Sequence, residues 1–283
     1  MCFLWLNCMI GQVWVCDVRG QSQPNVPSVP TLQEFFERLV GQSNASSPLK
    51  NDDLLKVIDT IAGISAEEVK KSLPAIFAAL AHPDDEVKKD AVFALWAVAR
   101  RPDGADLLKS RIDAIGQSLL SSANPDIRAG EIVTLGSLKP VPLPEVLPVF
   151  LTFLKRPDPE AQTQGTGVVF ELVHIAPENA EVVAAIQQFL SRQMDSQTRI
   201  GVLNALGSPA IKDVKLISSI ISSLNDSDVG VKTTAIQALV RIGKPALQQA
   251  EPDLQRLAAD PKQSPEVENN VQEALRRLHA PPK

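Results

Sequence analysis

The chain has 283 residues, of which 44% are apolar and only 4% aromatic, with no tyrosine. Apolar residues that are mainly Ala, Val, Leu and Ile suit closely packed helices better than a β-sandwich, which is rich in Tyr and Trp. The 28 basic and 33 acidic residues give a net charge of −5 with no block of like charge. Because phosphate binding needs clustered Lys and Arg, we expect an all-α protein that does not bind nucleic acid.

The first 16 residues, MCFLWLNCMIGQVWVC, carry no charged side chain and contain all three cysteines, Cys2, Cys8 and Cys16. Since the rest of the chain has no thiol, it excludes a disulfide framework, a zinc site built on cysteine and a cysteine nucleophile there. A secretory signal with cleavage near Gly20 fits the apolar length, although no basic residue precedes the run.

Residues 1–20 are accordingly interpreted as an apolar leader of an exported protein, periplasmic or extracellular. The alternatives are a cytoplasmic protein with a mis-assigned upstream start, or a buried N-terminal segment. The leader is short for a membrane span, which needs roughly 20 apolar residues, and no other stretch is apolar for long enough. We therefore expect no membrane span in the mature chain.

Residues 21–50 are interpreted as a Pro- and Ser-rich linker with one short amphipathic helix, TLQEFFERLV, which begins with a capping box of Thr31 and Glu34. A second amphipathic stretch, DDLLKVIDTIAG, starts at Asp52 and leads to a further capping box at Ser65. These early helices are expected to cover the open end of the array that follows.

Residues 51–279 repeat one phrase, whose clearest copy is NDSDVGVKTTAIQALVRIGKPAL at 225–247. Apolar residues stand 0, 4, 7 and 8 positions after Val231, and these offsets share one face of a helix. The same template starts at Val87, Ile127, Ala161, Thr198, Val231 and Val267. The copies are thus 33 to 40 residues apart, a period typical of stacked helical hairpins.

The residues that start and stop helices repeat with the same period. A proline follows each copy, at Pro102, Pro140, Pro177, Pro209, Pro245 and Pro281. A turn rich in Asp, Asn, Pro and Ser precedes each copy, and an amphipathic stretch lies upstream of the turn. Proline cannot continue a helix, and Asp, Asn and Ser cap helix N-termini. The predicted unit is helix, short turn, helix, proline, and stacking of six units buries apolar faces that one hairpin cannot cover alone.

The chain resembles the HEAT repeat family of armadillo-like α-solenoids over about residues 65–279. The resemblance rests on the Leu-Pro pairs at Leu73 and Leu147, which are expected to open first helices, the Asp/Pro turns, the Val-Lys or Ile-Arg that begins each second helix, and the Ala-Leu near its end. It implies an α-solenoid superhelix of about six antiparallel helix pairs with extra N-terminal helices, followed by a short tail at 280–283.

The family also tends to form a polar ladder between repeats, which Asp226 and Lys232 match. Other residues occupy the place of this Asp elsewhere, so a continuous ladder is not expected. The third repeat matches least well, because Gly165 and Gly167 each cost about 1 kcal/mol relative to alanine in a helix. We interpret it as a soft point in the stack.

The sequence contains no convergent set of reactive residues. The histidines, His82, His174 and His279, are not at metal-ligand spacing from one another or from carboxylates, and glycine-rich phosphate motifs are absent. Acids such as Asp84 stand at helix starts, where they cap the helix and complement its dipole. We therefore predict no catalytic residue, no metal, no cofactor and no enzymatic activity.

Basic residues and one tryptophan are the candidates for partner binding. Four basic residues follow the template reference by one position, and they either steer an acidic partner or pair with acids of the turns. Trp96 is rotated about 180° from Val87 and is either an anchor for a partner or packed beneath the N-terminal helices. The candidate partner-binding residues are Lys88, Lys89, Trp96, Arg128, Arg199 and Lys232.

The predicted function is a non-catalytic scaffold that binds a protein or peptide on the concave surface, which the second helices line. The alternative is a structural subunit that braces a larger assembly, such as one of the cell envelope. Some bilin lyases and alkylpurine DNA glycosylases have similar helical repeats, but this chain resembles them in architecture only. Its net charge of −5 also disfavours the glycosylase.

Overall fold

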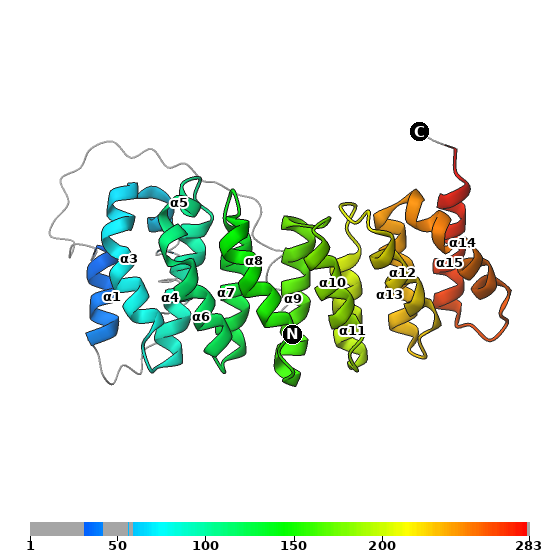
Figure 1. The fold of residues 1–283 in the computed structure, drawn as a ribbon, viewed down its shortest axis with the longest axis horizontal. Coiled ribbons are helices and arrows are strands. Elements are labelled where there is room, and N and C mark those ends of the chain that lie inside the picture. Colours follow the sequence, from blue (N-terminus) through cyan, green and yellow to red (C-terminus); the bar gives the residue numbers. More distant parts are fainter. Residues whose placement is uncertain (1–30, 42–55, 57–58, 282–283) are drawn as a thin grey trace, which may run out of the picture. The chain divides into compact units, whose positions relative to one another are not determined.

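The computed structural model describes residues 31–41, 56 and 59–281, and within these ranges the chain is helical without strands (Figure 1). The predicted leader and most of the predicted linker lie outside the described residues. None of the helices in the described part is long and apolar enough to cross a membrane.

The helix α1 (Leu32–Gly41) precedes the array and starts with the predicted capping box. The Glu34 amide donates to Thr31 Oγ1 at 3.3 Å, and the Thr31 amide donates to the Glu34 carboxylate at 3.0 Å. Phe36 is fully buried, as is Ile61 in a helical stretch at 59–63. Because α1 packs on α3 (Ala66–Leu80), it covers the first pair of the array as expected.

Six helix pairs follow, which confirms the predicted all-α solenoid. The first and second helices of the pairs are α3 and α4 (Asp85–Ala99), α6 (Ile112–Ser121) and α7 (Pro125–Ser137), α8 (Leu143–Leu154) and α9 (Pro159–Ile175), α10 (Ala180–Leu190) and α11 (Ser196–Leu206), α12 (Val214–Ser222) and α13 (Val229–Ile242), and α14 (Lys244–Ala259) and α15 (Pro265–His279). Three short segments complete the order: α5 (Gly104–Leu108), η2 (Lys109–Arg111) and η3 (Ser223–Asn225).

The pairs stand side by side, so that their helices form two layers (Figure 1). Second helices pack against second helices in the order α4, α7, α9, α11, α13 and α15, and first helices from α6 to α14 do the same in the other layer. The core lies between the layers. In α13 the template residues Val231, Ala235, Ala238 and Leu239 are all fully buried, which is the burial that the offsets predict.

Each second helix begins at a side-chain cap that accepts a hydrogen bond from a first-turn amide. The caps are Asp84, Asn124, Asp158, Asp195, Asp228 and Ser264. Such caps satisfy amides that have no partner within the helix, and acidic caps also complement the helix dipole. The interpretation of the turn acids as caps is therefore confirmed for Asp84.

The Leu-Pro pairs do not open the first helices, contrary to the sequence interpretation. Pro74 lies inside α3 and Pro148 inside α8, and Pro252 is likewise inside α14. All three prolines are exposed. On the solvent side, water can bind the helix carbonyl that loses its amide partner, so the helix continues past the proline.

Glycines in the second helices allow close approach of their neighbours. Gly130 of α7 lies directly against Val92 of α4. A Cβ at Gly165 of α9 would lie 2.7 Å from Cε2 of Phe189, a buried ring of α10. Gly165 therefore has a packing role. The interpretation of the third repeat as a soft point considered only the helix propensity of this glycine and not its packing.

The first-helix layer is interrupted once. The longest distance between successive copies of the repeat, from Val87 to Ile127, contains α5 and η2, which were not predicted from the sequence. α3 packs against α5, whereas each later first helix packs directly against the next one. The extra residues therefore separate α3 from α6.

Arginines that follow the C-terminal ends of helices join successive parts of the array, Arg101 after the second helix α4 and Arg156 and Arg192 after the first helices α8 and α10. Arg101 Nη1 donates to the carbonyls of Ile61 and Ile64, at 2.6 and 2.9 Å. Arg192 Nη1 donates to the carbonyl of Arg156 at 2.9 Å, and Arg156 in turn donates to the carbonyl of Leu120. These bonds satisfy C-terminal helix carbonyls and hold neighbouring repeats in register.

Candidate functional site

The exposed surface of the second helices is the candidate site, and we call it the second-helix face. It is formed by positions 6 and 9 after the template reference, which are rotated roughly 240° and 180° from that reference on a helix. The residues at these positions are Phe93, Trp96, Val133, Gly136, Gly167, Phe170, Asn204, Gly207, Gln237, Val240, Glu273 and Arg276. All of them are half-buried or exposed.

Aromatic side chains dominate the half of this face that lies on α4 and α9. Phe93 is 43% exposed and Phe170 is 48% exposed. Trp96 is half-buried, with the guanidinium carbon of Arg100 4.8 Å from its ring centroid. The Phe170 ring lies 4.2 Å from the ring of His174, whose Nδ1 is 2.7 Å from the Phe170 carbonyl oxygen. These contacts orient the rings of Trp96 and Phe170, which present an apolar surface together with Phe93.

A carboxyl group without a hydrogen bond or ion pair to any described residue lies between these aromatic positions. The side chain of Glu171 covers Gly136, where a Cβ would lie 2.8 Å from the Glu171 Cγ. Burial raises the pKa of Glu171 to about 7. Glycine at position 136 is therefore what allows the carboxyl to pack against α7.

The half of the face on α11, α13 and α15 is polar. Arg241 donates to Asn204 Oδ1 at 3.1 Å and to the Gly207 carbonyl at 3.2 Å. Gln237 donates to Asn270 Oδ1 at 3.2 Å. Amide side chains both donate and accept hydrogen bonds, so this half can bind the backbone of an extended segment.

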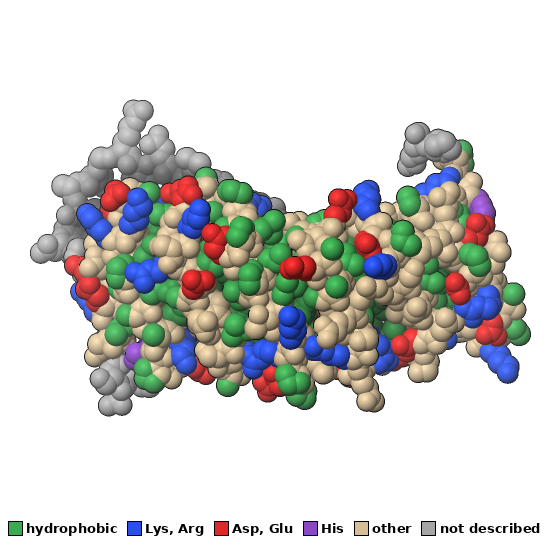
Figure 2. All heavy atoms as spheres, in the orientation of Figure 1, with side chains coloured by type: hydrophobic (Ala, Val, Ile, Leu, Met, Phe, Trp, Pro, Cys, Tyr) green, Lys and Arg blue, Asp and Glu red, His purple; other side chains and the backbone are tan. Residues whose placement is uncertain are grey.

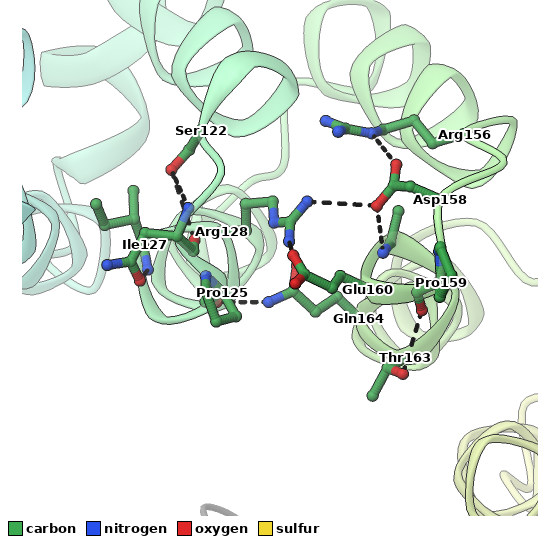
Figure 3. A network of polar contacts seen from close by, with 12 residues as sticks. Ser122, Pro125, Ile127, Arg128, Arg156, Asp158, Pro159, Glu160, Thr163 and Gln164 are labelled. Atoms are coloured by element: carbon green, nitrogen blue, oxygen red, sulfur yellow. Dashed lines mark hydrogen bonds and ion pairs between the residues drawn. The ribbon is translucent and has the colours of Figure 1, made fainter.

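The predicted basic stripe lies at the junctions between repeats. Arg128 is only 1% exposed, and its Nη2 donates to Glu160 at 2.8 Å (Figure 3). Its Nη1 lies 3.7 Å from Asp158, which also accepts a bond from Arg156. Figure 3 shows Gln164 of α9 bonded to the Pro125 carbonyl beside this network. Arg128 therefore joins α7 to the next pair from inside the protein.

The other basic candidates are also engaged within the chain. Lys88 Nζ lies 3.0 Å from Asp85, and Arg199 Nε lies 2.9 Å from Asp226 of the next turn. Lys232 donates to Gln263 at 3.2 Å. The Arg199 pair is a rung of the predicted ladder. At the α7–α9 junction, Asp158 and Glu160 take the place of the missing Asp.

Lys89 pairs with Glu86, and this hydrogen bond raises the pKa of Lys89. Burial, with the nearby charge of Glu86, raises the pKa of Asp90 to about 7. Basic and acidic side chains are mixed on the surface in view (Figure 2). Most of the stripe therefore pairs with local acids, as one of the two interpretations of the sequence has it, whereas Lys232 bonds to an amide. A role for these residues in partner binding stays a prediction.

Phe93, Phe170 and Glu171 were not predicted from the sequence as site residues. Phe93 and Phe170 were recoverable, because they stand at the two template positions that form the exposed face. The position of the Glu171 carboxyl group depends on Gly136 of the neighbouring helix. The residue pattern of one helix does not predict such a contact between helices. In the described part of the chain, no group of three or more His, Cys, Asp or Glu side chains is placed to hold a metal ion.

Stacked antiparallel helix pairs, with a side-chain cap at each second helix and polar rungs at several junctions, define an α-solenoid repeat protein. Residues 183–276 match the family model of HEAT repeats. This part of the chain is similar to HEAT repeats, and the predicted resemblance to that family is confirmed. No curated protein matches the sequence.

The chain is also similar to solved structures at low sequence identity. The archaeal HEAT-like repeats protein from Thermococcus onnurineus NA1 is 16% identical, with a TM-score of 0.53 and coverage of 90% of this chain and 98% of that one. An engineered protein is 17% identical, with a TM-score of 0.40 and coverage of 86% and 98%. A designed armadillo repeat protein in complex with a (KR)4 peptide is 16% identical, with a TM-score of 0.39 and coverage of 86% and 99%. The archaeal likeness concerns the fold alone.

Proposed function

We propose that the chain is a non-catalytic scaffold that holds a segment of a partner protein against the second-helix face. The observation that carries the proposal is the exposure of Phe93 and Phe170, at 43% and 48%. They are the exposed aromatic side chains of the described residues, and both lie on this one face. Large apolar side chains that remain exposed at one site favour a binding surface, because aromatic anchors contribute most to interface energy.

The two halves of the face supply different interactions. In the proposed complex, apolar side chains of the partner cover Phe93 and Phe170, and Trp96 with Arg100 borders the contact. The amides of Asn204 and Gln237 bind the partner backbone. Second helices pack closely against one another through glycines such as Gly130. We therefore place this layer on the inner, concave side of the solenoid.

Site-specific photocrosslinking in the native source tests the proposal. Benzoylphenylalanine replaces Phe93 or Phe170 in separate variants, and replaces Val214 as the control. Val214 is 63% exposed but belongs to the first-helix layer. We expect one discrete crosslinked product from positions 93 and 170 and none from position 214. The double variant F93S/F170S, with the crosslinker at position 133, should lose that product.

Equal crosslinking from all three positions would refute a binding site on the second-helix face. A second outcome separates the alternative function. If the chain migrates as part of a larger complex, and F93S/F170S leaves that complex intact, it acts as a bracing subunit that uses another surface.

We also propose export, on the basis of the leader alone, which lies outside the described residues. Mass spectrometry of the mature protein from its native source tests this. A new N-terminus near Gly20 is the expected result, and an intact Met1 contradicts it.

A further inference from the structure

The interruption of the first-helix layer leaves a cavity of about 600 Å³ between α3 and α6. Its lining includes Phe77 and Leu80 of α3, Lys88 of α4, Arg111 of η2 and Ser118 of α6. We call it the α3/α6 cavity. Sites for small molecules have volumes of roughly 300–1,000 Å³ and combine apolar walls with a few convergent polar groups. The α3/α6 cavity has this size and this composition.

Cationic groups from α4 and η2 converge on the cavity. The guanidinium carbon of Arg111 lies 5.5 Å from the ring centroid of Phe77. Among the described residues, no acid pairs with Arg111 and no acceptor takes its hydrogens. Lys88 lies 3.0 Å from Asp85, the acid in the lining, and Asp85 also accepts a bond from Asn124 at 3.0 Å. The acid is therefore satisfied within the chain, whereas the donors of Arg111 are free for a ligand.

A buried acid lies behind the cavity wall. Glu131 of α7 is fully buried, at a template position that is apolar or glycine in the other repeats. Both of its carboxyl oxygens lack a hydrogen-bond partner among the described residues. The hydroxyl of Ser118 is their neighbour, but the two groups are not in hydrogen-bonding geometry. Burial raises the pKa of Glu131 to about 8, so the group is a neutral acid at pH 7 and has a hydrogen to donate.

We propose that the α3/α6 cavity binds a small organic anion, with its carboxylate or phosphate group between Arg111 and Lys88 and its apolar body against Phe77 and Leu80. Ser118 completes the site. Its oxygen accepts the hydrogen of the protonated Glu131, and its own hydroxyl donates to the anion. A cationic ligand does not fit, because it would meet Arg111 and Lys88 while Asp85 is already paired.

This cavity lies in the layer opposite to the second-helix face, so the inference is independent of the proposed function. It explains two irregularities together. The additional residues of α5 and η2 open the cavity and supply Arg111, and Glu131 replaces an apolar core residue immediately behind it.

The test is a titration of the full chain followed by amide shifts in two-dimensional NMR. The probes are benzoate and phenyl phosphate, with benzylamine as the cation of matched size and inorganic phosphate as the anion without an apolar body. We expect saturable shifts with benzoate or phenyl phosphate, centred on residues 77–88 and 111–123. The stronger of the two probes identifies the anionic group. Inorganic phosphate should bind more weakly, and benzylamine should give no saturable shift.

Variants locate the site. R111Q is expected to weaken binding of the stronger probe roughly tenfold, as loss of a hydrogen bond to a charged group typically does. K109Q is the matched control, because Lys109 is an exposed residue of the same 3-10 turn outside the lining. E131V removes the donor behind Ser118 and should weaken binding while the melting temperature rises.

Three results would overturn the proposal: no saturable shift with either aromatic anion, equal binding of benzylamine, or equal affinities of R111Q and K109Q. Unchanged affinity in E131V would overturn the part assigned to Glu131. The amide spectrum of each variant shows whether it is folded, so loss of binding is distinguished from loss of structure.

Discussion

Replacing Glu131 by glutamine is expected to stabilise the chain increasingly as the pH rises from 5 to 8. Burial raises the pKa of this carboxyl from 4.5 to about 8. Above pH 4.5 the unfolded chain loses the proton, whereas the folded chain retains it until about pH 8. Folding therefore takes up a proton within this window, and the stability of the wild-type chain falls as the pH rises through it.

The size of the effect follows from the two pKa values. One proton corresponds to a slope of about 1.4 kcal/mol per pH unit, and the whole window to on the order of 4–5 kcal/mol. The glutamine amide is neutral at every pH and removes this slope. The difference in free energy of unfolding between E131Q and wild type should thus shift by several kcal/mol in favour of E131Q between pH 5 and pH 8.

Urea unfolding monitored by circular dichroism at pH 5, 6, 7 and 8 measures the difference between the two proteins. If the array unfolds in parts, hydrogen exchange of the α7 amides gives the same comparison locally. E68Q is the control. Hydrogen bonds from the Ser65 amide and hydroxyl lower the pKa of Glu68, so this group is ionised in both states above pH 5 and its effect should be constant. A pH-independent difference for E131Q would refute the reasoning, because it would mean that Glu131 is ionised in the folded chain.

Further substitutions test the packing and the caps, each measured as the change in free energy of unfolding in urea. Gly165→Ala should destabilise by about 1–3 kcal/mol, because its Cβ meets the buried Phe189 ring. Gly167→Ala on the same helix should instead stabilise by about 0.5–1 kcal/mol, because its Cβ would lie 3.8 Å from Ile132 Cγ2, an ordinary van der Waals contact. Equal effects of the two would contradict the packing role. Gly243→Ala should cost about 1–3 kcal/mol, because φ is 109° at this residue; no cost would contradict a rigid left-handed link. Asp195→Ala should cost about 1 kcal/mol through loss of the α11 cap, and a neutral result would contradict capping.

The repeating part of the fold was predictable because each pair obeys the same local rules. The template offsets select the buried face, as the complete burial of Val231 and Leu239 shows. The turn acids select the helix start, as Asp84 shows. Such rules depend on residues within one hairpin, so one sequence is sufficient to apply them.

The features that were not predicted depend on neighbouring hairpins or on solvent. Exposed Pro74 continues a helix because water can satisfy the freed carbonyl, which a rule based on proline alone does not consider. Arg128 reads as a surface residue from its charge, yet acids of the next turn allow its burial. Glu131 is visible in the sequence as an acid at an apolar template position, but its proposed role depends on the separation of α3 from α6.

The tight glycine contacts between second helices have a mechanical consequence. Where Gly130 lies on Val92, the backbones have little room to approach further, so that layer resists compression. The first-helix layer has no direct α3–α6 packing of the kind that its later members share. If the array flexes under load, the hinge belongs at this junction, and a molecule lodged there would act as a wedge that sets its angle.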